Sequence, residues 1–331
     1  MQNPRRDKII LVTPAPPGAN NGNRRTAERW AGFLADGFDS IVQARWDGQP
    51  AALFIALHAW RSHESIVAMT RSQPRTPIIV VLTGTDLYRD MANRPLTLES
   101  LEIADVVVAL QEDAVQHVPP RWQGKTQVIY QSAQSLAPLP KSGGEFEFAV
   151  VGHLRAEKDP LRVIEALRSL PAHLPLRVTH IGESLDAHLE SELRRLAADE
   201  PRYRWIGGMD HGGTREAMRR AHALIHPSLM EGGANVIAEA ITAGTPVIAS
   251  RVSGNIGMLG ASYPAYFSAG HDEELGRLML RAMDPVFYAR LAAAAAARAE
   301  LFAPAREASE LQKLVVRLIG MRGQSEPPSQ A

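Results

Sequence analysis

The stretch HPSLMEGGANVIAEAITAGTPVIAS, residues 226–250, decides the fold of the C-terminal half. A strand-like run ends at its start, the pair Gly232 and Gly233 follows, and a helical pattern then leads to another apolar strand. Two glutamates, Glu231 and Glu239, flank the beginning of this predicted helix. The start of a helix presents unpaired N–H groups and a positive dipole end, and therefore attracts anions such as phosphate.

The two carboxylates restrict the kind of anion that this helix start can receive. A carboxylate that points into the same crevice repels phosphate, but it can accept hydrogen bonds from hydroxyl groups. The combination predicts a ligand that carries both phosphates and hydroxyls, such as a nucleotide sugar. The same helix has an apolar face, with Val236, Ile237, Ala240 and Ile241, so part of the stretch is predicted to be core.

Composition narrows the class of protein. The 331 residues suit two domains, and 45% apolar residues are enough for two cores. Lys and Arg together number 36, as do Asp and Glu, and this zero net charge argues against a nucleic-acid binder. The lack of cysteine excludes disulfides, thiolate metal sites and a cysteine nucleophile. The first apolar run is too short for a signal or membrane segment, so we expect a cytoplasmic protein without stable membrane association.

Strand-like apolar runs alternate with helical patterns along the whole chain. In the first half these runs are residues 8–14, 40–46, 53–59, 77–85, 104–110 and 126–133. In the second half they are residues 146–154, 176–183, 203–208, 223–228 and 245–250. Continuous apolar strands between helices predict parallel sheets covered on both faces.

We therefore predict an α/β protein with two Rossmann-like domains that face each other across a cleft. The Pro- and Gly-rich segment 134–145 is the best linker candidate. The predicted parts are an N-terminal acceptor domain over 1–140, a nucleotide-sugar donor domain over 145–300, a C-terminal helix over 301–320 that crosses back to the first domain, and a disordered tail over 321–331. Ligands of such sheets bind beyond the carboxyl ends of the strands.

A pair of cations follows the first strand of the second half. Arg155 and Lys158 lie in VGHLRAEKDP, between the strand end and a helix predicted to start near Pro160. A planar guanidinium and an ammonium at this edge suit a diphosphate. The alternative is a solvated loop with two ordinary charges, and the glutamate-containing stretch downstream favours the diphosphate site.

Polar residues also follow four strands of the first half, in TPAPPGANNGNRRTA, ALHAWRS, LTGTDLYRD and VIYQSA. The first of these lacks G-x-G-x-x-G, so an NAD fingerprint is not supported. Taken singly, the loop could be an ordinary surface loop and His58 a core histidine. Together they predict an acceptor site made by Asn20, Gly22, Asn23, Arg24, His58, Thr85 and Asp86.

The motifs VGHLRAEKDP, HIGE, WIGG and the stretch 226–250, with DPVFYARLAAAAAARAELF near the end, resemble retaining glycosyltransferase family 4, of GT-B architecture. The resemblance implies that Glu231 contacts the donor sugar and Glu239 the ribose hydroxyls. It implies that Arg155 and Lys158 neutralise the diphosphate without a metal ion. The nucleotide cradle would be completed by Gly208, Met209, Gly232, Gly233, Ala234 and Asn235. EGGAN stands here in place of the commoner EGFGL of the family.

The four segments of the first half resemble more narrowly the selenosugar synthase branch of that family, from selenoneine biosynthesis. This implies a UDP-sugar donor such as UDP-N-acetylglucosamine and selenophosphate as the selenium source, with no cofactor and only small-molecule partners. It places His58 in the catalytic set with Arg155, Lys158 and Glu231. The alternatives are an ordinary hexosyltransferase with a sugar or alcohol acceptor, a UDP-sugar epimerase, and a regulator that binds nucleotide sugars without turnover. A regulator is expected to lose the charged donor residues, which are all present.

Overall fold

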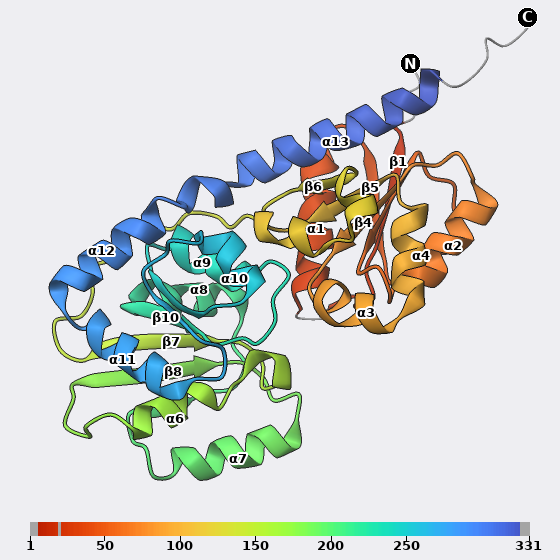
Figure 1. Cartoon of the computed structure of the whole chain (residues 1–331). Helices are drawn as coiled ribbons and strands as arrows, with labels where there is room; N and C mark the ends of the chain where they lie inside the picture. The colour runs from red at the N-terminus through yellow and green to blue at the C-terminus, as the bar shows by residue number, and fades with distance from the viewer. Residues whose placement is uncertain (1–5, 19–20, 325–331) are drawn as a thin grey trace, which may run out of the picture. The chain divides into compact units, whose positions relative to one another are not determined.

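The computed structural model describes residues 6–18 and 21–324, with side chains as far as Met321, and it divides into two compact units. The first unit comprises the chain up to Gln131 together with the segment from Pro304 onward. The second unit spans Ser132–Ala303. Each unit contains its own six-stranded sheet, in which all strand pairs are parallel (Figure 1).

The first sheet has the strand order β2-β1-β3-β4-β5-β6. Its strands are β1 (Lys8–Val12), β2 (Asp39–Gln43), β3 (Leu53–Leu57), β4 (Ile78–Leu82), β5 (Val106–Ala109) and β6 (Thr126–Val128). The helices are α1 (Gly22–Leu34), α2 (His63–Ser72), α3 (Met91–Asn93), α4 (Pro95–Ile103), α5 (Pro120–Gln123) and α13 (Pro304–Gln324), with the short turns η1 (Asp86–Asp90) and η2 (Glu112–His117). Every residue of β3 and β4 is buried, as their uninterrupted apolar sequences predict.

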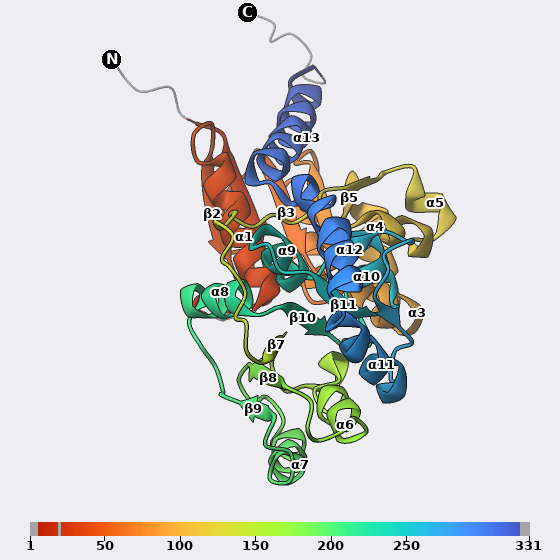
Figure 2. The same cartoon turned by 90° about the vertical axis from the view of Figure 1, so that its left-hand side faces the viewer.

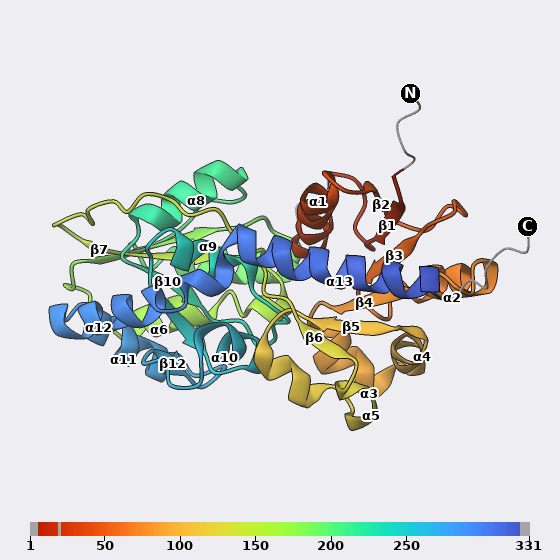
Figure 3. The ribbon, with the colours of Figure 1, turned by 90° about the horizontal axis from the view of Figure 1, so that it is seen from above.

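Side chains alternate between two cores, one on each face of this sheet. Ile10, Phe54 and Val80 join residues of α2 and α4 in the first core. The second core contains the intervening strand residues, among them Leu11 and Ile55, with α1 and α13. Figure 3 shows α13 extending along the first unit. The helix that the sequence predicted to cross back to the first domain therefore completes its core.

A buried carboxylate fixes α13 on α1. Glu307 accepts a hydrogen bond from Trp30 Nε1 at 2.7 Å and pairs with Arg29, whose Nε lies 2.8 Å from Oε2. The Glu307 side chain is fully buried, so the charge is compensated by directed partners instead of water. The helix continues to Gln324, which corrects the predicted start of a disordered tail at residue 321; residues 325–331 lie outside the described residues.

The second sheet has the order β12-β11-β10-β7-β8-β9 (Figure 2). Its strands are β7 (Phe146–Val151), β8 (Leu176–Ile181), β9 (Tyr203–Trp205), β10 (Ala223–His226), β11 (Val247–Ser250) and β12 (Tyr266–Phe267). The helices are α6 (Arg162–Arg168), α7 (Ala187–Ala197), α8 (His211–Arg220), α9 (Asn235–Thr242), α10 (Ser253–Leu259), α11 (Asp272–Ala282) and α12 (Pro285–Ala296), with the turns η3 (Ala156–Lys158) and η4 (Ala299–Phe302). Strands β10 and β7 are therefore neighbours, although 71 residues separate the end of β7 from the start of β10.

The segment between the two sheets differs from its prediction. The strand predicted over 126–133 ends at Val128, and the chain then continues without a ladder. The predicted linker 134–145 is packed on the second unit: Lys141 Nζ donates to the carbonyls of Arg219 at 2.8 Å and Ala221 at 2.7 Å. Burial lowers the pKa of Lys141 to about 8. A Pro- and Gly-rich composition predicted irregular backbone correctly, but not its packing.

No helix of residues 6–18 and 21–324 combines the length and the apolar character that a membrane span requires.

Replacement of Glu307 tests the attachment of α13. We expect Glu307→Ala to lower the free energy of unfolding by about 2–3 kcal/mol, because Trp30 and Arg29 lose a charged partner in a buried position. Glu310→Ala is the matched control on the same helix. It removes only a partly exposed pair with Arg306 and should cost about 0.5 kcal/mol or less. Chemical denaturation followed by circular dichroism measures both; equal losses would contradict the assignment.

Candidate functional site

Adjacent strands of the second sheet bring Lys158 and Glu231 together. Lys158 ends the turn η3 after β7, and Glu231 lies in the loop after β10. Lys158 Nζ forms an ion pair with Glu231 Oε1, and Leu229 N donates to Glu157 O at 2.9 Å. The stem of Lys158 passes over Gly152, 3.7 Å from the position that a Cβ would occupy there. Two residues predicted separately for the donor site are thus in direct contact.

A buried histidine lies on the other side of Glu231. His226 ends β10, is 1% exposed, and has Nε2 3.2 Å from Glu231 Oε1. Burial acts to raise the pKa of Glu231, but the Lys158 charge and His226 outweigh it and hold this pKa well below its ordinary value. Burial lowers the pKa of His226. Glu231 is therefore a carboxylate beside a neutral imidazole at neutral pH.

Glycine allows the chain to pack closely beneath Glu231. A Cβ at Gly254, in the first turn of α10, would lie 2.0 Å from the Glu231 carbonyl oxygen and 2.6 Å from its Cβ. A similar approach occurs between the ends of β7 and β8, where a Cβ at Gly182 would lie 1.9 Å from Gly152 O. These two glycines set the spacing of the loops that carry Lys158 and Glu231.

The second predicted carboxylate is held by a different element. Glu239 lies in α9, is 8% exposed, and accepts a hydrogen bond from His211 Nε2 at 2.9 Å. His211 begins α8 directly after the segment that contains Gly208 and Met209. The backbone at Gly208 packs on Glu183, since a Cβ there would lie 2.6 Å from Glu183 Cγ. His211 therefore connects the part of the predicted nucleotide cradle around Gly208 and Met209 with the carboxylate predicted to bind ribose.

The start of α9 follows the predicted glycine pair Gly232 and Gly233. Ala234 occupies the N-cap and offers no side-chain acceptor to the first-turn N–H groups. Asn235 begins the helix, and its buried Oδ1 has no hydrogen-bond partner in the described part of the chain. Arg155 is exposed, and its guanidinium forms no ion pair with any residue that the structure describes. The helix start and Arg155 are both available to an anion.

In the first unit, His58 lies at the end of β3 with a backbone φ of 73°, a left-handed conformation that is uncommon outside glycine. Its Nδ1 accepts from Arg61 N at 3.3 Å, so Nε2 carries the proton and donates to Thr85 Oγ1 at 3.0 Å. Burial lowers the pKa of His58, which favours this neutral form. The predicted residues His58 and Thr85 are thus in contact.

The environment of Asp86 does not suit a residue that contacts substrate. It is fully buried, and its carboxylate accepts from Thr83 N at 2.8 Å, Gly84 N at 2.9 Å and Ala59 N at 2.9 Å. It therefore joins the ends of β3 and β4 and positions the neighbouring Thr85. These contacts favour a structural role for Asp86 within the predicted acceptor site.

The first turn of α1 approaches the same strand ends. Asn23 Nδ2 donates to Thr83 Oγ1 at 3.4 Å. Arg24 pairs with Glu28 at 2.6 Å, while its buried Nη1 has no hydrogen-bond partner in the described part of the chain. Gly22 starts α1 and is exposed, and Asn20 lies outside the described residues. The N-cap itself is Asn21, which accepts from Arg24 N at 2.9 Å.

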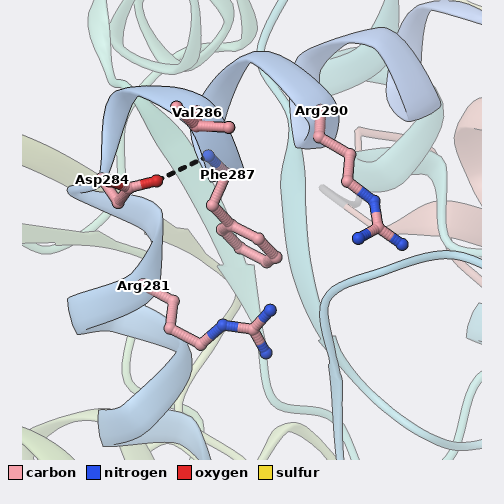
Figure 4. A pocket seen from close by; sticks show the side chains of 5 residues that line it. All are labelled: Arg281, Asp284, Val286, Phe287 and Arg290. Carbon is pink, nitrogen blue, oxygen red and sulfur yellow. Dashed lines mark hydrogen bonds between the residues drawn. The ribbon is translucent and has the colours of Figure 1, made fainter.

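A hollow with none of the predicted site residues lies where α11 meets α12 (Figure 4). Its lining residues are Arg281, Asp284, Val286, Phe287 and Arg290. The Arg281 guanidinium lies 4.3 Å from the centroid of the Phe287 ring, and Asp284 caps α12 by accepting from Phe287 N at 2.8 Å. Arg281, Asp284 and Phe287 are thus explained by the N-cap of α12 and the packing beside it.

The sequence missed three residues that shape the site: His226, His211 and Gly254. The HPS run, residues 226–228, predicts only a strand end, although a histidine five residues before a glutamate is within reach of it across a tight loop. His211 and Glu239 are 28 positions apart and on different helices, so no local pattern links them. The GN pair after β11 is a signal for a close backbone approach.

The family model described as "Glycosyl transferases group 1" matches residues 132–295. This segment includes the ends of β7 and β10, both glutamates and the start of α9. Residues 132–295 therefore resemble a glycosyl transferases group 1 domain.

Curated relatives match part of this chain over part of their own length. Glycogen synthase of Mycobacterium tuberculosis (strain ATCC 25618 / H37Rv) is 33% identical over 118 residues, which are 34% of this chain and 27% of the relative. Glycosyltransferase 1 domain-containing protein 1 of Xenopus tropicalis is 23% identical over 202 residues, or 55% of this chain and 59% of the relative. The match thus spans about a quarter of the glycogen synthase and under two thirds of the Xenopus protein.

Solved structures share the architecture of the whole chain. Sucrose-phosphate synthase from Thermosynechococcus elongatus has a TM-score of 0.77 at 17% identity, with 96% of this chain and 100% of that chain covered. Anabaena Alr3699/HepE in complex with UDP-glucose has a TM-score of 0.73 at 15% identity, with 94% and 100% covered. The chain therefore has the predicted two-domain GT-B fold, and the residues that match the glycosyl transferases group 1 model lie in its second unit.

Close packing at Gly254 can be tested without any substrate. We expect Gly254→Ala to lower the free energy of unfolding by about 1–3 kcal/mol, because the new Cβ overlaps the Glu231 backbone and the loop must shift. Gly276→Ala in α11 is the control, since its Cβ would have no contact closer than 3.4 Å. Thermal denaturation compares the two variants. A Gly254→Ala protein as stable as the control would contradict the packing described here.

Proposed function

We propose that this protein is a glycosyltransferase that uses a UDP-sugar donor. The observation that carries the proposal is the cluster at the carboxyl edge of the second sheet, where Lys158 and Glu231 are paired beside the start of α9 and Glu239 is held by His211. This cluster combines positive charges, a helix start without a side-chain cap, and carboxylates that can accept hydrogen bonds from hydroxyl groups. The complexes of Anabaena Alr3699/HepE with UDP and with UDP-glucose, on the same fold, support the choice of donor.

The cations have complementary roles in this proposal. Arg155 is exposed and without an ion-pair partner among the described residues, so it can bind the diphosphate with little rearrangement. Lys158 must exchange part of its contact with Glu231 for a phosphate oxygen. Both charges then stabilise the departing UDP, together with the α9 N–H groups. This arrangement supplies the charge neutralisation without a metal ion, and activity should persist in EDTA.

The glutamates bind different parts of the donor. Glu239 is anchored between α9 and the segment around Gly208 and Met209, which suits the ribose of UDP. Glu231 directly precedes the glycine pair and lies next to Lys158. This position suits a contact with a hydroxyl of the transferred sugar. Since Lys158 and His226 both lie at Oε1, the other oxygen of Glu231 is available to accept that hydroxyl.

For the acceptor, we propose selenophosphate, with UDP-N-acetylglucosamine as donor, in the cytoplasm. Its selenium would form a bond to C1 of the sugar as the bond from C1 to UDP breaks; water then takes the phosphoryl group, giving a 1-seleno-sugar, UDP and phosphate. The resemblance of the strand-end segments to selenosugar synthases supports this choice. Arg24, whose buried Nη1 has no hydrogen-bond partner among the described residues, and the hydroxyl of Thr85 provide hydrogen-bond donors for an anion.

The state of His58 also bears on the choice of acceptor. An alcohol acceptor needs a general base, whereas a selenium nucleophile is already anionic near neutral pH. The His58 Nε2–H is used to hold Thr85, and Nδ1 accepts from Arg61 N. Neither ring nitrogen is thus an open proton acceptor, which supports the selenium acceptor over a hydroxyl acceptor.

Calorimetry with UDP separates the two glutamates. Glu239→Ala should weaken UDP binding about tenfold or more, because the ribose loses a charged acceptor. Glu231→Ala should leave the Kd for UDP within about twofold, yet lower sugar transfer by roughly a hundredfold. An equal loss of UDP affinity in both variants would show that the assignment of ribose and sugar is wrong.

A product assay tests the proposed reaction. Purified protein is incubated in EDTA with a panel of UDP-sugars, with and without selenophosphate, and the products are identified by mass spectrometry. We expect a seleno-sugar and UDP only when selenophosphate and UDP-N-acetylglucosamine are both present. Transfer to sugars or alcohols instead would favour an ordinary hexosyltransferase, and UDP binding without any product would favour a regulator.

A further inference from the structure

His226 contacts the proposed donor site but has no role in the proposed function so far. Its ring is 1% exposed and lies at the end of β10, a strand that pairs with β11 on one side and β7 on the other. Its Nε2 lies 3.2 Å from Glu231 Oε1, the same oxygen that pairs with Lys158. A buried polar group beside a charged residue that binds ligand is a candidate for holding that residue in place.

The two neighbours of Glu231 behave differently when a donor arrives. Lys158 has 18% of its side chain exposed and sits on a short turn, so it can follow a diphosphate. His226 is enclosed by the sheet and cannot reach a ligand. If Lys158 alone held Glu231, the carboxylate would lose its support at the moment of the reaction.

We propose that His226 is a positioning residue that holds Glu231 for the donor sugar while Lys158 turns to the diphosphate; this inference rests on the proposed function. The geometry leaves room for such an exchange. The Nε2–H of His226 makes no aligned hydrogen bond with any atom of the described residues, although the oxygen is only 3.2 Å away. A small rotation of Glu231 away from Lys158 aligns this hydrogen bond and satisfies a buried polar atom that otherwise costs free energy.

The packing around Glu231 limits that rotation. Gly254 touches its backbone from α10 with no room for a side chain, so the loop cannot sink further. Below it, Ser250 Oγ donates to Ser228 O, and Asn255 Nδ2 donates to Ser250 O at 2.9 Å. The backbone around Glu231 is thus fixed, and only the carboxylate moves between Lys158 and His226.

Variants of His226 test the proposal. In His226→Leu, which cannot donate, kcat for sugar transfer should fall by roughly ten- to a hundredfold, as expected for a misplaced ligand-binding group, while the Kd for UDP stays within about twofold. His226→Gln places an amide N–H near the position of Nε2 and should recover most of the rate. If His226→Leu does not fold, His226→Met replaces it.

His222→Leu is the matched control, because His222 is buried just before the other end of β10, where its ring nitrogens hydrogen-bond to Glu147 N and Ser142 O. At temperatures below its unfolding transition, the His222→Leu variant should have the same kcat as the wild type. A Gln variant as slow as the Leu variant, or a control that is equally slow, would overturn the positioning role.

A second readout does not depend on turnover. The carboxyl carbon of Glu231, observed by ¹³C NMR during an acid titration, should begin to shift at higher pH in His226→Leu than in the wild type, because one of the groups that lower its pKa is gone. Identical titrations would overturn the proposal. If the wild type transfers no sugar, the proposed function fails by itself, and this titration still decides whether His226 holds Glu231.

Discussion

The ion pair of Lys158 and Glu231 is the interaction on which the second unit's site depends. It joins the loops after two adjacent strands, and its members are 18% and 11% exposed. Two charges in so little water are costly unless each keeps further partners. Glu231 has a second neighbour in His226, whereas Lys158 has no ion-pair partner besides Glu231 among the described residues. The lysine is therefore the member that gains most from an incoming phosphate.

That imbalance explains why the surrounding backbone is so tightly built. Gly254 beneath Glu231 and Gly182 beneath the end of β7 leave no space for a Cβ. His180 adds a buried hydrogen bond from β8, with Nε2 3.0 Å from Gly152 O, and burial lowers its pKa to about 4, so it stays neutral. A rigid frame of this kind lets one flexible ammonium change partners while the backbone that carries the Glu231 carboxylate stays in place.

Much of the fold follows from sequence pattern alone, because uninterrupted apolar strands between helices have few alternatives to a covered parallel sheet. The positions of Arg155, Lys158 and Glu231 after strands mark them as candidates, and Glu239 is marked by its place in the helix that follows. Their partners could not be found in this way, since Lys158 and Glu231 are 73 residues apart and the pairing depends on strand order. The packing of the segment 134–145 escaped prediction for the same reason, because Lys141 reaches carbonyls about 80 positions away.

In the first unit, a strained backbone conformation orients a side chain. His58 adopts a φ of 73°, and other contacts must offset the free-energy cost of this conformation. Asp86 does so by accepting hydrogen bonds from three backbone N–H groups, that of Ala59 and those of Thr83 and Gly84 at the end of β4. The strain turns the imidazole so that Nε2 meets Thr85 while Nδ1 faces Arg61 N. Because Nε2–H donates to Thr85 Oγ1, the hydroxyl proton of Thr85 is directed away from His58 and can be given to an anion. The buried Asp86 carboxylate thus holds the backbone from which His58 contacts Thr85, while Arg61 N fixes the tautomer of the neutral histidine.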